Sequence, residues 1–141
     1  MIEFLDSSAL VKRYVPEPGS ALIRRLCASG EIAVSRVVFA EVAAAVARAS
    51  REGGLTDDDR DRVLDQLADD VDAFQTIELR RAVVEATRPL VTRHPLRGYD
   101  AVQLASAMAI QGRGRSLRFW SADSRLVAAA RSEGLRAQIP A

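Results

Sequence analysis

Short apolar runs alternate along the chain with longer segments in which apolar residues recur every three or four positions. The short runs predict buried strands and the longer segments predict amphipathic helices. The expected strands cover residues 2–5, 32–34, 74–79 and 117–120, with an edge strand at 136–139. The expected helices cover residues 9–11, 20–28, 35–49, 56–73, 81–92, 99–111 and 124–133. Ser20 and Thr56 are the expected N-caps of two of them, and Ser35 is expected to open a third.

This alternation predicts an α/β protein, because strands joined through helices form right-handed crossovers and a parallel sheet covered on both faces. We therefore expect a single domain spanning residues 1–141 with a three-layer α/β/α fold. Its central, mostly parallel sheet has about four to five strands and is flanked by about seven helices. The helix pair within residues 35–73 is long for one crossover, which favours an arm that projects from the sheet.

Four carboxylates fall at strand ends or near helix starts. Asp6 ends the first predicted strand and Asp123 follows the fourth, while Glu41 and Asp100 lie in the early turns of two helices. Ligands of open parallel sheets bind beyond the carboxyl ends of the strands, so one edge of the sheet is expected to gather these acids. Converging carboxylates repel one another unless a proton or a cation intervenes. Oxygen ligands suit Mg²⁺ or Mn²⁺, and such sites perform phosphate chemistry.

Each acid also has a purely structural interpretation. Asp6 and Asp123 are good helix N-caps, and Asp100 complements a helix dipole. Glu41 fits a solvated helix position beside an apolar stripe. The coincidence of all four is therefore more informative than any one of them.

Composition mainly excludes other classes. Cys27 is the only cysteine, so this chain alone forms neither an intramolecular disulfide nor a cysteine-based zinc site. No segment resembles a secretory signal or a membrane span, so we expect a cytoplasmic protein without a membrane partner. The net charge of +1 neither demands nor excludes nucleic acid, but the many arginines provide phosphate-binding groups. The candidates for such contacts are Arg13, Arg36, Arg97, Arg113, Arg115 and Arg125, of which Arg113 and Arg115 form the best basic loop.

Three motifs resemble those of PIN-domain nucleases, and especially of the VapC toxins of bacterial toxin–antitoxin pairs. The first is FLDSSALVK at residues 4–12, the second is RGYDAVQLASA at 97–107, and the third is FWSADSRL at 119–126. Glu41 falls where the family carries its second acid. Ser7 and Ser121 stand where the family often has Thr, and both keep a hydroxyl group.

The resemblance implies a Mg²⁺- or Mn²⁺-dependent ribonuclease with a catalytic set of Asp6, Glu41, Asp100 and Asp123. In this interpretation the three aspartates hold the metal, and Glu41 either ligates it or acts as general base. Ser8 and Ser121 are supporting hydrogen-bond partners. The expected products carry a 5′-phosphate and a 3′-hydroxyl. The implied partners are a tRNA, rRNA or mRNA substrate, a cognate VapB-like antitoxin and a second copy of the chain.

Other functions compete with this interpretation. A phosphatase that works through an aspartyl phosphate needs an acid two residues after Asp6, where this chain has Ser8. A receiver domain needs a late lysine, and the only lysine is Lys12. A catalytically silent binding module, or a PIN-domain ribonuclease that processes RNA without an antitoxin, stays open. We assign no catalytic role to His94, the only histidine.

Overall fold

Five parallel strands form the central sheet in the order β3-β2-β1-β4-β5. The computed structural model describes all residues from Met1 to Ala141. The strands are β1 (Ile2–Leu5), β2 (Glu31–Ser35), β3 (Gln75–Ile77), β4 (Leu117–Trp120) and β5 (Arg136–Gln138). The α-helices are α1 (Ser7–Leu10), α2 (Ser20–Ser29), α3 (Val38–Arg51), α4 (Asp57–Ala73), α5 (Arg81–Glu85), α6 (Thr87–Arg93), α7 (Gly98–Gln111) and α8 (Ser124–Ser132), with a 3-10 turn at Val11–Arg13.

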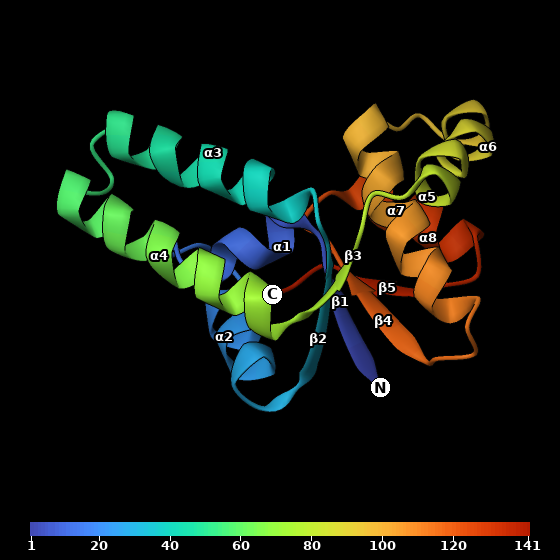
Figure 1. The fold of residues 1–141 in the computed structure, drawn as a ribbon, viewed down its shortest axis with the longest axis horizontal. Helices are drawn as coiled ribbons and strands as arrows, with labels where there is room; N and C mark the ends of the chain where they lie inside the picture. Colours follow the sequence, from blue (N-terminus) through green and yellow to red (C-terminus); the bar gives the residue numbers. More distant parts are fainter.

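Helices cover both faces of this sheet, which confirms the predicted three-layer α/β/α fold. Figure 1 shows α1 to α4 on one side and α5 to α8 on the other. Successive side chains of β1 point to opposite faces of the sheet, so the strand contributes to two separate cores. Ile2 and Phe4 belong to a cluster of 19 buried residues beneath α5–α8. Leu5 joins a second cluster of 13 buried residues beneath α1–α4.

The order of the strands reverses at β1. The chain first winds outward from β1 to β2 and β3, then returns through α5–α7 to β4 on the other side of β1. Such a switch point opens a crevice at the carboxyl ends of the two central strands. Leu5 and Trp120 are partners in the parallel register, so the residues that follow them leave the sheet side by side. Asp6 and Ser121 are those residues.

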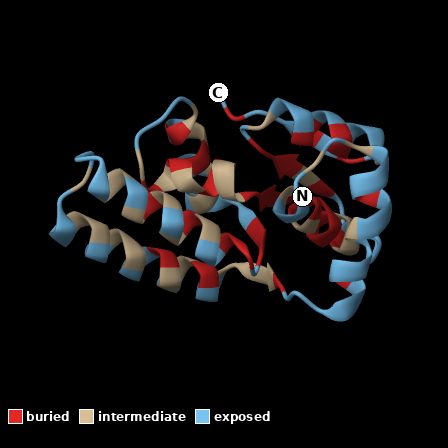
Figure 2. Cartoon of the chain, turned by 90° about the horizontal axis from the view of Figure 1, so that it is seen from above, coloured by how far each residue is buried: buried red, intermediate tan, exposed pale blue.

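Helices α3 and α4 form the arm that the sequence predicted. Figure 1 shows the pair extending well beyond the sheet, and Figure 2 shows that its far end is mostly exposed. In α3 the residues Val38, Val42 and Val46 are buried, at the spacing of one helical face. In α4 only Leu67 and Val71 are buried. No helix of the protein has the length and apolar character needed to cross a lipid bilayer.

Three local predictions differ from the structure. Ser35 does not open a helix: it remains paired to Ile77 in the sheet, and α3 begins three residues later. Ser20 is not the N-cap of α2, because Gly19 takes that position and the Ser20 hydroxyl accepts from the amide of Glu17 instead. Residues 81–92 form two helices rather than one, which accounts for the eighth α-helix.

Candidate active site

All four predicted acids line one pocket of about 380 Å³ at the carboxyl edge of the sheet. Asp6 comes from the end of β1, Asp123 from the end of β4, Glu41 from α3 and Asp100 from α7. The pocket also contains Ser7, whose hydroxyl group the motif comparison noted, and Arg48 and Gln103, which the sequence motifs did not single out. The convergence predicted from strand ends and helix starts is therefore confirmed.

Asp6 is the most buried member of the set, with 4% of its surface exposed. Its Oδ1 accepts hydrogen bonds from the Ser8 hydroxyl at 2.7 Å and from the Ala9 amide at 2.9 Å, so it caps α1 as well as lining the pocket. Burial raises the pKa of Asp6 to about 6, and the hydroxyls of Ser121 and Ser8 offset part of that rise. Asp6 is therefore the N-cap of α1, as predicted, and its place in the pocket is also compatible with the functional interpretation.

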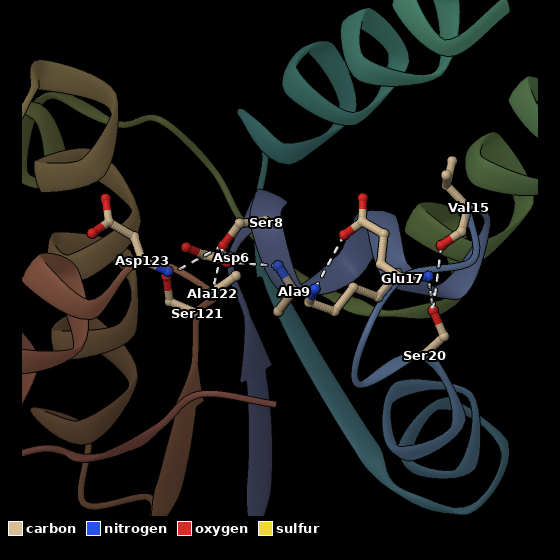
Figure 3. A network of polar contacts seen from close by, with 10 residues as sticks. Asp6, Ser8, Ala9, Val15, Glu17, Ser20, Ser121, Ala122 and Asp123 are labelled. Atoms are coloured by element: carbon tan, nitrogen blue, oxygen red, sulfur yellow. Dashed lines mark hydrogen bonds and ion pairs between the residues drawn. The ribbon is translucent and has the colours of Figure 1, made fainter. Parts of the chain in front are cut away.

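Ser8 ties the two central strand ends together. Its hydroxyl accepts from the Ala122 amide at 2.8 Å and lies 3.3 Å from the Ser121 hydroxyl, which in turn accepts from the Asp123 amide at 3.0 Å. Figure 3 shows this chain of contacts between Asp6 and Asp123 at the ends of neighbouring strands. The predicted supporting roles of Ser8 and Ser121 thus correspond to direct contacts that fix both backbone turns.

Glu41 is held by two donors from distant parts of the chain. The Ser7 hydroxyl donates to its Oε1 at 2.6 Å, and the Gln103 amide donates to the same oxygen at 3.0 Å. Gln103 also donates to the Ser7 hydroxyl at 2.9 Å, which closes a triangle. Gln103 is only 2% exposed. The sequence signal for a role in the site was a polar residue between Val102 and Leu104, on the buried side of a predicted helix.

Asp100 occupies the first turn of α7. Its Oδ2 accepts a long hydrogen bond of 3.4 Å from the Arg97 amide. Burial raises the pKa of this carboxyl group, and the charges of Asp123 and Glu41 raise it further, with the Arg97 amide acting in the opposite direction. The acids therefore lie close enough to repel one another, as predicted for a site that attracts cations.

The chemistry of these donors fits a hard divalent cation. In each carboxylate the protein donors reach a single oxygen, which leaves the other oxygen open to a ligand. The Oε1 atom of Gln103 is the one buried side-chain polar atom in the protein without a hydrogen-bond partner. No three acidic, histidine or cysteine side chains are yet gathered closely enough to hold a metal ion. A cation would therefore bind here only if the carboxylate side chains rotated toward one another.

Several arginines proposed for phosphate contacts have other roles. Arg13 pairs with Asp70, and Arg36 pairs with Glu78. Arg115 pairs with Glu31, and the loop that it shares with Arg113 precedes β4, at the opposite end of that strand from the acids. The basic loop was therefore a wrong choice, because a loop that precedes a parallel strand lies at the amino end of that strand, away from the acids.

Comparison with known proteins identifies the family. The family model described as PIN domain matches residues 4–132. The chain belongs to the PIN-domain family. The PIN-domain match spans all three acidic motifs and Glu41, and it confirms the resemblance inferred from them.

Individual PIN-domain relatives extend this result. The chain is 36% identical over 134 residues to "Ribonuclease VapC49" of Mycobacterium tuberculosis, covering 94% of this chain and 92% of the relative. The structure is similar to that of FitAcB from Neisseria gonorrhoeae, with a TM-score of 0.71, 16% identity, and coverage of 99% and 98% of the two chains. It is also similar to a toxin–antitoxin complex from Klebsiella pneumoniae, with a TM-score of 0.64, 16% identity, and coverage of 89% and 90%. These structural similarities support the PIN-like fold.

Proposed function

We propose that this PIN-domain protein is a ribonuclease that uses Mg²⁺ or Mn²⁺ to hydrolyse RNA phosphodiester bonds. The observation that carries the proposal is the gathering of Asp6, Glu41, Asp100 and Asp123 in one pocket at the switch point of the sheet. The 36% identity to a protein named as a ribonuclease supports the same activity. The complete acidic set disfavours a catalytically silent module.

The residues of the pocket have different roles in the proposed reaction. Asp6, Asp100 and Asp123 would hold the cation through their open carboxylate oxygens. A bound divalent cation polarises the phosphate and lowers the pKa of water. Glu41 accepts the proton from the attacking water, and Ser7 and Gln103 hold its carboxylate in a fixed orientation for that step. Water attack that breaks the bond between phosphorus and the 3′-oxygen leaves a 5′-phosphate and a 3′-hydroxyl, and the departing 3′-oxygen takes a proton from solvent.

Metal dependence is the direct test. We expect purified, partner-free protein to convert total bacterial RNA into discrete fragments in Mg²⁺ or Mn²⁺, and to stop when EDTA is added. The fragment ends are identified by their sensitivity to phosphatase and by ligation. Cleavage that persists in EDTA would contradict the proposal, and folded protein that cleaves nothing in either metal would favour the silent module.

Gln103 provides a finer test of how Glu41 is positioned. Replacing Gln103 with Leu removes the donor to Glu41 and also the buried, unpaired Oε1. We expect RNA turnover to fall by about 10- to 100-fold, while stability in urea stays equal or increases slightly. Gln111→Leu, an exposed site on the same helix, is the matched control and is expected to leave turnover unchanged. If Gln103→Leu lowers both RNA turnover and the free energy of unfolding, the residue has a structural role instead.

We further propose that a VapB-like antitoxin restrains the enzyme and that the enzyme forms a homodimer. The identity to a VapC protein supports the antitoxin, and an acidic pocket suits a partner arginine as a charge-assisted hydrogen-bond donor. An apolar hollow of about 330 Å³ between α5, α6 and α7 supports self-association. Co-expression with the adjacent short reading frame, followed by mass measurement of the purified complex, tests both. A neighbouring gene without a DNA-binding antitoxin would favour an RNA-processing role.

A further inference from the structure

The rim of the acidic pocket carries two arginines that have no protein partner. Arg48 of α3 and Arg97 at the start of α7 both line the pocket, and neither forms an ion pair. Some arginines elsewhere, such as Arg13 and Arg118, are paired with carboxylates, and others, such as Arg88, are unpaired but lie outside the pocket. Unpaired guanidinium groups beside four unpaired carboxylate oxygens indicate that this pocket receives a ligand with its own negative charge.

Tyr99 lies in the first turn of α7, two positions after Arg97, and is unusually exposed. Its side chain belongs to the exposed large apolar set, and at 65% it is the most exposed member. In sequence it stands between Arg97 and Asp100, which both line the pocket, and one helical turn before Gln103, which lines it too. Residues four apart share a face of a helix, and helical side chains lean toward the N-terminus. The ring therefore has no role in the core, and it belongs to the same helical turn as the pocket residues Arg97 and Asp100 without being part of the pocket lining.

We infer that Tyr99, Arg97 and Arg48 form a subsite for one nucleotide of single-stranded RNA. Tyr99 stacks on a base, and the two guanidinium groups bind the phosphates on either side of it. The inference rests on the proposed ribonuclease function and names the form of its substrate.

Physical chemistry favours this assignment over direct binding by the acids. Carboxylates repel phosphates, so the affinity for the RNA backbone must come from cations at the rim. A base in a duplex has both faces covered, whereas an unpaired base is free to stack on an aromatic ring. Stacking on Tyr99 next to Asp100 would hold the chain where its phosphate reaches the acids.

Binding in the absence of metal separates this subsite from catalysis. The probe is a fluorescein-labelled single-stranded RNA of about ten nucleotides, titrated with the protein in EDTA and followed by anisotropy. We expect Tyr99→Ala to weaken binding about tenfold and Tyr99→Phe to retain it, because stacking needs only the ring. Arg97→Gln and Arg48→Gln are each expected to reduce the dependence of log K on log salt by about 0.7.

An abasic scan identifies the stacked base. Removing one base at a time from the probe is expected to weaken binding to the wild type strongly at one position. Tyr99→Ala is expected to be insensitive to the same removal, since the two changes delete opposite halves of one contact. Phe39→Ala, an exposed aromatic outside the pocket, and Arg88→Gln, an exposed unpaired arginine on α6, are matched controls expected to change nothing.

The possible outcomes distinguish the subsite from the function. If the wild type binds and cleaves RNA but Tyr99→Ala binds equally well at every abasic position, the subsite is wrong and the ribonuclease stands. Wild-type affinity for a blunt RNA duplex equal to that for the single strand would also overturn the subsite. If the wild type neither binds nor cleaves RNA, the proposed function fails together with the subsite.

Discussion

Replacing Asp6 with Asn is expected to reduce RNA cleavage by at least about 100-fold and at the same time to stabilise the metal-free protein at neutral pH. The loss of activity follows because the amide contributes no negative charge to the cation site. The gain in stability follows because Asp6 is a buried carboxylate next to Glu41. An amide oxygen still accepts the hydrogen bonds of Ser8 and Ala9, so the cap of α1 is kept.

The stabilisation has a defined pH dependence. The pKa of Asp6 is raised from 3.8 to about 6 on folding, so the folded state holds this proton more tightly than the unfolded state. The wild type therefore loses stability as the pH rises from about 4 to above 6, by an amount on the order of 2–3 kcal/mol. Asp6→Asn lacks this loss, so the free energies of unfolding in urea should diverge over that range. Saturating Mg²⁺ is expected to stabilise the wild type only.

Asp58→Asn is the matched control for this experiment, since Asp58 is exposed on α4 and contacts no other side chain by hydrogen bond or ion pair. We expect it to retain both activity and the wild-type pH profile. An Asp6→Asn variant that cleaves RNA normally would overturn the proposed site. A variant that is inactive but less stable than the wild type at pH 7 would show that the negative charge of Asp6 supports the fold.

Replacing Arg118 with Leu is expected to lower the free energy of unfolding by about 2 kcal/mol at neutral pH. Arg118 pairs with Glu3, which is 6% exposed and also accepts a hydrogen bond of 2.6 Å from the indole of Trp120. Without the guanidinium group a buried carboxylate keeps only the indole as partner. Partial exposure of Arg118 lets water replace some of the lost interaction, which limits the expected cost.

This cost is expected to disappear in acid. Burial raises the pKa of Glu3, but hydrogen bonds from Arg118 and Trp120 outweigh it and hold the pKa below its usual value. The pair therefore stabilises the fold fully above about pH 4.5 and less as the pH falls through the folded-state pKa. The free energies of unfolding of the wild type and Arg118→Leu, measured in urea, should accordingly converge below about pH 4.5.

Arg115→Leu is the control for this comparison. It removes an exposed pair with Glu31 and is expected to lower the free energy of unfolding by less than about 1 kcal/mol at any pH. A constant difference between the wild type and Arg118→Leu would mean that lost packing, not charge, explains the effect.

The local pattern of apolar and polar residues was sufficient to predict the elements whose structure depends on residues near in sequence. The strand at Leu117–Trp120, the helices around it and the caps at Asp6, Thr56 and Asp123 were all predictable. Alternation of apolar residues and side chains that bond their own backbone are short-range effects, so they are visible in a sequence. The helix start after β2 was misplaced because Ser35 offers a good cap but stays in the sheet through its pairing with Ile77.

The acidic set was predictable for a related reason. Parallel strands expose their carboxyl ends at one edge, so acids that follow strands and open helices gather there without knowledge of the strand order. The resemblance of the sequence motifs to those of PIN-domain nucleases points to the same four residues. Sequence alone thus determined the fold class and the family, and it predicted which four carboxylates lie together at the carboxyl edge of the sheet.

Only the tertiary structure decided which other residues serve the site. Gln103 and Ser7 reach Glu41 across 62 and 34 positions of sequence, and no local pattern couples them. The tertiary structure likewise brings Arg48 of α3 and Arg97 at the start of α7 to the same pocket. The physical reason is that charges and amides act over a few ångströms in space, so their partners depend on crossovers that bring distant segments together.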